Sequence, residues 1–375
     1  MIKQTLADLV SIDSVSSRSN LEIVEYLERR CGTTGFVTKR FPYFDEHGLE
    51  KINLVALADA DFSGTPNVEL ALVGHTDTVP YDPNWTEATN LTERDGKLYG
   101  RGSCDTKGFI AAALTAVETI DRSQLKKPLA LIFTADEEVG LIGAKRLAEL
   151  KAINPRYSIV GEPTSLKPIR AGKGYSLAEV VVKGREAHSA YPALGASAIF
   201  RAARLVSRLE GIADTLKQQL HPAFDPPFTT LNIGLIRGGS AKNVLAGECR
   251  FTLEWRPIPT QPSSHVLNLV KAAIADEQRN DPEFECDVQP TRADFGFETA
   301  PDSPLVSLLE QATGIESGTV AFGTEAAQMT SLGSEAVVIG PGDIREAHRT
   351  GEFVPLDELE RCAEILKVAI NRLCI

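Results

Sequence analysis

The sequence predicts an α/β fold in which a mainly parallel β-sheet is covered by helices on both faces and is interrupted by a smaller inserted domain. Nearly all-apolar segments alternate with helical segments in the first third and the last quarter of the chain; they occupy residues 68–74, 129–134, 157–160 and 336–339. Strands that are apolar along their whole length are typical of a parallel sheet buried between helices. The middle of the chain follows another order, strand–helix–strand–strand–helix–strand, which is typical of a ferredoxin-like unit.

Two helices are predicted between the strands of the larger domain, an Ala-rich one over 108–120 and another over 143–150. The middle of the chain predicts strands over 176–182, 229–236, 249–255 and 284–288 and helices over 198–209 and 266–277. We therefore expect a discontinuous catalytic domain of residues 1–173 and 288–375. Residues 174–287 are expected to form the inserted ferredoxin-like (βαββαβ) domain.

Length and composition agree with two domains. A chain of 375 residues is too long for one ordinary domain, and 43% hydrophobic residues can fill a sizeable core. The formal net charge of −12 argues against nucleic-acid binding, which needs a basic stripe. No segment approaches the ~18 apolar residues of a membrane span, and Met1–Val10 does not resemble an export signal.

The cysteines indicate a reducing compartment. Six of them are scattered along the chain without a Cys-x-x-Cys pair, at Cys31, Cys104, Cys249, Cys286, Cys362 and Cys374. In a chain of this length such cysteines are typically reduced and buried. We therefore expect a cytoplasmic protein.

Histidines and carboxylates follow the predicted strands at the points where these strands end. His75 comes directly after the strand over 68–74, Glu138 follows the strand over 129–134, and Glu162 follows the strand over 157–160. His348 lies beyond the strand over 336–339, and Asp105 precedes the helix over 108–120. Ligands of open α/β sheets bind outside the carboxyl ends of the strands, so these five side chains are expected to converge. Their mixture of imidazole and carboxylate suits zinc, cobalt or manganese.

Each of these residues also has an ordinary structural interpretation. The His75-x-Asp77 spacing is common in hydrogen-bonded turns, and the paired Glu137 and Glu138 could simply begin a helix. Glu162 before a proline could be a turn residue, and His348 could lie on the surface. The shared location at one end of the predicted strands is what favours a metal site.

Five segments, taken in order, resemble the motifs of a known family: Val73–Pro80, Tyr99–Gly108, Thr134–Gly140, Gly161–Thr164 and Ala347–His348. This metallohydrolase family contains acetylornithine deacetylases, succinyl-diaminopimelate desuccinylases, aminoacylases and some carboxypeptidases. The resemblance spans the whole chain, including the inserted domain. It implies an aminopeptidase-like catalytic domain with two metal ions, and an inserted domain that acts in lid closure and dimerisation.

The resemblance also implies roles for individual residues. His75, Asp105 and Glu162 resemble the ligands of one divalent ion, while Glu138, His348 and the shared Asp105 resemble those of a second. Zinc is expected and cobalt is plausible, and a site with a single bound ion stays open. The family further implies a cis peptide bond after Asp105.

Two carboxylates near these ligands match catalytic positions of the family. Asp77 resembles the carboxylate that orients His75, and Glu137 resembles the general base. The implied mechanism is attack on an amide carbonyl by a metal-bridging water that Glu137 deprotonates, without a covalent intermediate. Cys104 lacks a partner base, so we interpret it as structural.

The inserted domain adds three candidates. His188 resembles the family histidine that reaches the active site of a partner subunit, which implies a homodimer, and Asn243 resembles a second residue that stabilises the oxyanion. Arg256 resembles the arginine that binds the α-carboxylate of the substrate. A surface histidine and a surface ion pair remain the alternatives for His188 and Arg256.

The segment around Gly323, Thr324 and Glu325 is expected to bind substrate and to distinguish members of the family. It resembles the deacetylases that act on N2-acetyl-L-ornithine in arginine biosynthesis, and Glu325 is a plausible partner for the ornithine ammonium. His188–Pro192 is instead similar to the desuccinylases. The alternatives are therefore a succinyl-diaminopimelate desuccinylase, another N-acyl-amino-acid hydrolase or carboxypeptidase, and, from a different class, a catalytically inactive binding protein.

Overall fold

The computed structural model describes residues 1–375, which divide into two compact units. Unit 1 contains residues 1–170, 298–318 and 324–375, and unit 2 contains residues 171–297 and 319–323. The inserted segment therefore starts near residue 171 and runs to 297, some residues beyond the expected 174–287. The later end has a plain cause: the last strand of the insertion, expected over 284–288, continues as β12 (Cys286–Asp294).

Unit 1 is built on a nine-stranded sheet in the order β1-β2-β6-β3-β7-β15-β8-β13, with β14 paired to β8. Its centre is parallel and is formed by β6 (Leu129–Thr134), β3 (Asn67–His75), β7 (Asn154–Val160) and β15 (Glu335–Val338). An antiparallel pair, β1 (Val37–Phe44) and β2 (Glu50–Ala58), extends one edge. The short strands β8 (Ile169–Gly172), β13 (Phe297–Glu298) and β14 (Gly318–Val320) complete the other edge.

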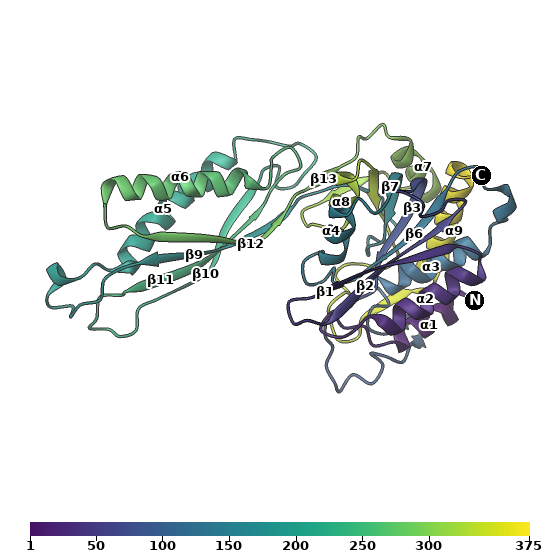
Figure 1. Ribbon diagram of the computed structural model, residues 1–375, viewed down its shortest axis with the longest axis horizontal. Helices are drawn as coiled ribbons and strands as arrows, with labels where there is room; N and C mark the ends of the chain where they lie inside the picture. Colours follow the sequence, from purple (N-terminus) through teal and green to yellow (C-terminus); the bar gives the residue numbers. More distant parts are fainter. The chain divides into compact units, whose positions relative to one another are not determined.

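Helices cover both faces of this sheet, as predicted (Figure 1). One face carries α1 (Ile2–Ser11), α2 (Leu21–Thr33), α3 (Lys107–Glu118), α7 (Pro304–Thr313) and α9 (Leu356–Leu373), which share one hydrophobic core. The other face carries α4 (Ile142–Glu149) and α8 (Ala326–Ser331), which pack against each other. No helix combines the length and the apolar composition that a membrane span requires.

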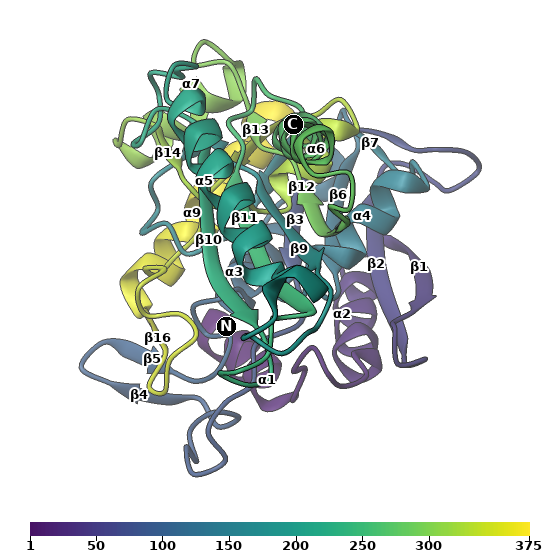
Figure 2. The ribbon, with the colours of Figure 1, turned by 90° about the vertical axis from the view of Figure 1, so that its left-hand side faces the viewer.

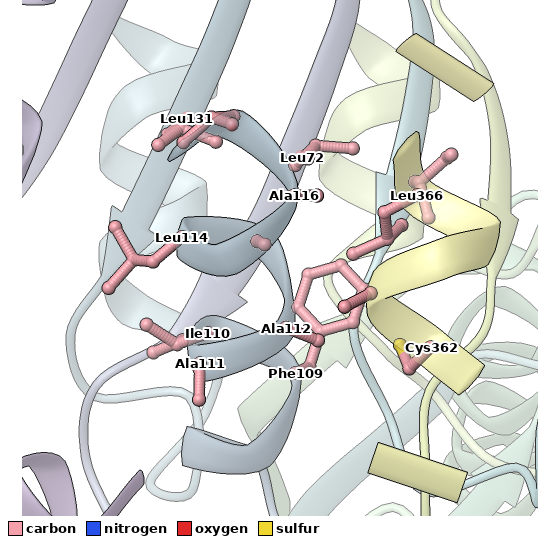
Figure 3. Packing of buried hydrophobic residues seen from close by; sticks show 14 of the residues in the cluster. Leu72, Phe109, Ile110, Ala111, Ala112, Leu114, Ala116, Leu131, Cys362 and Leu366 are labelled. Atoms are coloured by element: carbon pink, nitrogen blue, oxygen red, sulfur yellow. The ribbon is translucent and has the colours of Figure 1, made fainter. Parts of the chain in front are cut away.

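Helix α3 lies at the centre of the larger core. Ten of its twelve residues are buried, because it packs on the sheet between α1 and α9. The ring of Phe109 points from α3 toward Cys362 and Leu366 of α9 (Figure 3). A Cβ on Gly161 would lie 2.1 Å from Cγ of that ring, so the glycine lets β7 end directly against α3. This tight contact fixes the segment that precedes α3 relative to the strand ends.

A three-stranded sheet lies apart from the large one in the order β16-β5-β4. It consists of β4 (Thr92–Arg94), β5 (Lys97–Tyr99) and β16 (Phe353–Pro355). The pairing of β5 with β16 brings the segment before Asp105 next to the segment after His348. The sequence did not predict this small sheet or the β1–β2 pair.

Unit 2 is a four-stranded antiparallel sheet with two helices on one face (Figures 1 and 2). The strands are β9 (Tyr175–Lys183), β10 (Thr230–Gly238), β11 (Glu248–Arg256) and β12, in the order β10-β11-β9-β12. The helices α5 (Ala198–Leu216) and α6 (Ser264–Asn280) are longer than predicted and bury the alternate residues of β9 and β11. The element order confirms the predicted ferredoxin-like arrangement.

Candidate active site

The parallel strands of unit 1 deliver histidine and carboxylate side chains to one edge of the sheet. His75 is the last residue of β3, Glu137 and Glu138 follow β6, and Glu162 follows β7 two residues after its end. His348 lies in the loop after β15, with φ = 60°. All five positions belong to the carboxyl ends of adjacent strands, where the sequence placed them.

One group that could hold a metal ion consists of His75, Asp105 and Glu162. Nε2 of His75 lies 3.0 Å from Oδ1 of Asp105, and one ligand atom of each residue lies within 4.8 Å of the others. All three side chains are buried, with exposed fractions of 1%, 6% and 7%.

A second such group consists of Asp105, Glu138 and His348. Nε2 of His348 lies 3.2 Å from Oδ2 of Asp105 and 3.0 Å from Oε2 of Glu138. Asp105 therefore belongs to both groups and directs a different oxygen to each histidine. The side chain of His348 is 49% exposed, so the second group opens toward solvent while the first is enclosed.

Negative charge exceeds positive charge in this cluster. Burial raises the pKa of Glu137 and of Glu162 well above the ordinary value, and the neighbouring carboxylates raise both further. The pKa of His348 rises to about 10 because Asp105 and Glu138 accept hydrogen bonds from its ring. Two imidazoles face four carboxylates here, and buried charges are stable only when they are compensated. Divalent cations would supply that compensation, and nitrogen and carboxylate oxygen donors fit them.

Asp77 supports the cluster in two ways. The ring Nδ1 of His75 donates to the backbone carbonyl of Asp77 at 3.0 Å and lies 3.7 Å from its carboxylate, so the backbone makes the closer contact. The Asp77 carboxylate instead accepts the backbone N–H groups of Glu137 at 3.1 Å and Glu138 at 3.3 Å. It also accepts the hydroxyl of Ser16 at 2.7 Å. Asp77 thus connects His75 to the turn that carries both glutamates.

Glu352 is a residue that the sequence did not identify as part of the site. Its side chain is fully buried, and its Oε1 accepts the backbone N–H groups of Cys104 at 3.0 Å and Asp105 at 3.1 Å. Arg101, which is also buried, donates to the other oxygen at 2.5 Å. Glu352 therefore fixes the backbone of the shared aspartate. The peptide bond that follows Asp105 is cis, as the resemblance predicted.

Glu325 lies close to His75 and Asp77, and Thr324 precedes it in the chain. Glu325 is 1% exposed, and burial raises its pKa to about 7. His75 lies near enough to lower that pKa and Asp77 near enough to raise it. One carboxylate oxygen of Glu325 is buried without a hydrogen-bond partner. The hydroxyl of Thr324 accepts the backbone N–H of Ala326, the first residue of α8, at 3.3 Å.

Within unit 2, the structure brings His188 and Asn243 together. The backbone N–H of Ser189 donates to the carbonyl of Asn243 at 3.0 Å, and His188 forms an isolated antiparallel bridge with Val244. Both His188 and Asn243 are exposed. The backbone N–H of Ala190 donates to Nδ1 of the His188 ring at 3.1 Å, so in the neutral ring the proton is on Nε2.

Arg256 lies at the end of β11, elsewhere in unit 2. Its guanidinium stacks on the ring of Tyr175, 3.7 Å from the centroid, and its Nε donates to Glu254 at 2.7 Å. Arg292 lies over the same ring at 4.6 Å. Gly323 belongs to unit 2 by its contacts, whereas Glu325 belongs to unit 1.

Cys104 has no base beside its sulfur. Its thiol donates to the backbone carbonyl of Asp343 at 3.5 Å, and burial raises its pKa far above the ordinary value. All six cysteines are free. A thiol that stays protonated is not a nucleophile, which agrees with the structural interpretation of Cys104.

Comparison with known proteins identifies relatives along the whole chain. A protein of Myxococcus xanthus named acetylornithine deacetylase is 52% identical over 374 residues, which cover 100% of this chain and 97% of the relative. A protein of the same name from Proteus mirabilis (strain HI4320) is 35% identical over 369 residues, which cover 97% of this chain and 92% of the relative.

Solved structures share the fold. Aminopeptidase PepT from Bacillus cereus ATCC 10987 matches with a TM-score of 0.79 and 22% identity, over 99% of this chain and 98% of that one. An M20 family metallo-carboxypeptidase from Sulfolobus solfataricus matches with a TM-score of 0.76 and 17% identity, over 98% of both chains. At these identities the likeness concerns the fold alone, and it confirms the predicted α/β class.

The family model described as peptidase family M20/M25/M40 matches residues 71–372, which include every residue of the two candidate ligand groups. Together with relatives at 52% and 35% identity, this match confirms the resemblance found in the motifs. The chain belongs to peptidase family M20/M25/M40.

Proposed function

We propose that this enzyme hydrolyses the N-acetyl amide of N2-acetyl-L-ornithine to L-ornithine and acetate, a step of arginine biosynthesis. The observation that carries the chemistry is Asp105, whose two oxygens face two different histidines and join two candidate ligand groups. The relatives named acetylornithine deacetylase support the substrate.

Two divalent ions complete the proposed site. His75, Asp105 and Glu162 would hold one, and Glu138, His348 and the shared Asp105 would hold the other. This donor set suits zinc, and cobalt also fits it. When bound, such ions lower the pKa of water and polarise a carbonyl oxygen.

Glu137 is the proposed general base. Its carboxylate takes a proton from the water whose oxygen attacks the carbonyl carbon of the amide. The same carboxyl then gives this proton to the nitrogen of ornithine as the C–N bond breaks. One feature supports the role: the Asp77 carboxylate accepts the backbone N–H of Glu137 and so fixes the backbone from which this side chain starts.

Arg256 is the proposed partner of the α-carboxylate of the substrate. Its Nε is already bonded to Glu254 and its plane is held against Tyr175, so both terminal nitrogens keep a fixed orientation. A fixed guanidinium fork matches the two oxygens of a carboxylate. Gly323, Thr324 and Glu325 are proposed to bind the remainder of the substrate.

His188 is proposed to stabilise the oxyanion in the active site of a partner subunit, and Asn243 is proposed to help at the oxyanion. The Nε2–H of the neutral His188 ring is available to donate to the amide oxygen as negative charge develops on it. An exposed apolar edge strand supports association through unit 2: Leu235 and Ile236 of β10 are 61% and 54% exposed. Unpaired edges of this kind favour pairing with another chain. The six free cysteines support a reducing compartment, and we propose the cytoplasm.

Substrate choice tests the proposed function directly. In a panel of N-acyl amino acids, acetylornithine should give the highest kcat/KM, and treatment with a chelator should abolish turnover until zinc or cobalt is restored. The similarity of His188–Pro192 to the desuccinylases makes succinyl-diaminopimelate the key competitor in this panel. A higher kcat/KM for that substrate, or no turnover of any member with metal supplied, would refute the proposal.

The neighbouring glutamates should respond differently to the same substitution. Glu137→Gln removes proton transfer and keeps the ligand groups, so activity should fall by ~10²–10⁴ while metal content is retained. Glu138→Gln weakens a ligand, so it should lower metal content as well as activity. Kinetics with metal analysis separates the two; near-normal turnover in Glu137→Gln would contradict its role as the base.

The role of Glu325 can be tested with two substrates. If the Glu325 carboxylate binds the side-chain ammonium of acetylornithine, Glu325→Gln should raise KM for this substrate far more than for acetylmethionine. The side chain of acetylmethionine has a similar length but no charge. A charge-assisted hydrogen bond contributes roughly 1.5–3 kcal/mol, so selectivity should shift by ~10–150-fold. Because Glu325 is 1% exposed, the competing outcome is an equal loss with both substrates, which would assign it a supporting role.

Subunit mixing tests the shared site. Glu137→Gln and His188→Ala should each be nearly inactive alone. In a mixed dimer, the His188→Ala subunit keeps its own Glu137 and can receive His188 from its partner. Random reassociation should therefore restore about a quarter of wild-type activity, because half of the dimers are mixed and each has one complete site. No recovery, or a monomer in sedimentation experiments, would exclude the arrangement.

A further inference from the structure

A buried ion pair lies directly behind the turn that carries Glu137 and Glu138. It joins Lys51 of β2 to Asp136, the residue before Glu137, with Nζ of Lys51 3.0 Å from Oδ1 of Asp136. Both side chains are essentially excluded from solvent, with exposed fractions of 1%. None of the roles proposed above uses either residue.

The ammonium of Lys51 has three acceptors in place. It forms the ion pair with Asp136, and it donates hydrogen bonds to the backbone carbonyl of Ser16 and to that of Arg18 at 2.7 Å. An ammonium has three N–H donors and no acceptor, and here two of the three oxygens around it accept hydrogen bonds while the third carries the opposite charge. Because Lys51 is buried as well as engaged within the protein, its action is confined to the groups that it contacts.

Tyr43 holds Asp136 from the neighbouring strand. Its hydroxyl donates to Oδ2 of Asp136 at 2.8 Å. Tyr43 and Lys51 are directly opposed residues of the β1–β2 pair, so one position of a rigid antiparallel ladder supplies both partners of the carboxylate. The two oxygens of Asp136 are thus occupied by different side chains from the same place in the sheet.

The backbone of Asp136 explains why it needs this support. Its φ is 57°, in the left-handed region that residues with a side chain rarely adopt. Two backbone hydrogen bonds then close the turn. The N–H groups of Gly140 and Leu141 donate to the carbonyl of Glu137 at 3.0 Å and 2.9 Å. The direction of the Glu137 side chain depends on this turn, since its backbone begins one residue after the unusual φ.

Ser16 connects the ion pair to the other support of the same turn. Its carbonyl accepts from Lys51, while its hydroxyl donates to the Asp77 carboxylate that binds the N–H groups of Glu137 and Glu138. The glutamate turn is therefore held by Asp77 and by Asp136, and Ser16 contacts Asp77 directly and Asp136 only through Lys51.

We propose that Lys51 is a positioning residue, which acts with Tyr43 through Asp136 to keep the turn after β6 in the conformation that directs Glu137 at the substrate amide. The inference rests on the proposed function for its kinetic consequence, but the hold on the turn is a property of the chain itself. The competing interpretation is a buried ion pair that stabilises the fold without affecting the orientation of Glu137.

Four variants and one control test this role in the full-length, metal-loaded enzyme. Lys51→Met should lower kcat for acetylornithine about 10–100-fold with less than about a 3-fold change in KM, because a misplaced base slows the reaction more than binding. Tyr43→Phe, which removes one hydroxyl, should lower kcat about 3–10-fold. Tyr26→Phe is the matched control: it deletes a hydroxyl bonded to Asp8 at 3.2 Å, far along the chain from this turn, and should change neither value.

The last two variants are Asp136→Asn and its combination with Lys51→Met. If Lys51 acts through Asp136, the effects of the two substitutions on kcat should not multiply. The double variant should be no slower than Lys51→Met alone, because the unpaired buried charge is gone. Independent, multiplying losses would show that Lys51 does not act through Asp136.

Hydrogen exchange gives a readout that does not require catalysis. The amides of Gly140, Leu141 and Ile142 should exchange about 10-fold faster in Lys51→Met and Tyr43→Phe, while the control matches the wild type. If wild type fails to hydrolyse acetylornithine, the proposed function fails, and exchange alone then decides the role of Lys51. Should Lys51→Met not fold, Tyr43→Phe decides. Unchanged kcat and unchanged exchange in the folded variants would overturn the inference.

Discussion

The structure depends on one carboxylate that serves two centres. Asp105 presents Oδ1 to His75 and Oδ2 to His348, so its position sets the separation of both candidate ligand groups at once. A small rotation of this side chain would improve one contact and lengthen the other. The backbone of Asp105 is therefore held in place: its N–H donates to buried Glu352, which is itself paired with Arg101.

A second buried carboxylate supports the turn with Glu137 and Glu138 in the same way, by accepting backbone N–H groups. The Asp77 carboxylate binds the backbone N–H groups of Glu137 and Glu138, as Glu352 does for the segment before α3. Burial would raise the pKa of Asp77, but hydrogen bonds from its neighbours keep that pKa below the ordinary value, so it stays an acceptor. Acidic groups can therefore support other acidic groups because each bonds to backbone N–H donors and leaves the side chains of its neighbours free.

The sequence predicted the ligand cluster because the end of a strand can be recognised from the residues around it. The residues that support the cluster, Glu352 and Lys51, cannot be recognised in this way. His75 and Glu162 come directly after apolar segments, and their convergence follows from parallel pairing. Glu352 and Lys51 reach the site through contacts with residues 247 and 85 positions away in the chain, and no local pattern marks such pairs. The small sheet β16-β5-β4 was not predicted because its strands have three residues each, too few to show an alternating pattern. The identity of the family came from motifs, not from periodicity.

The residues that support the site and the candidate metal ligands differ in how their charges are compensated. Lys51 and Arg101 are buried cations that hold the supports. Lys51 pairs with Asp136 and donates to backbone carbonyls, and Arg101 pairs with Glu352 and donates to the carbonyl of Pro80. The cluster of candidate ligands has no such lysine or arginine, and its excess charge is left for mobile cations. A fixed ammonium at the place of an ion would satisfy these carboxylates permanently and remove their affinity for metal. Lys51 and Arg101 therefore lie behind the candidate ligands, where they help to orient the backbone without competing for the metal ions.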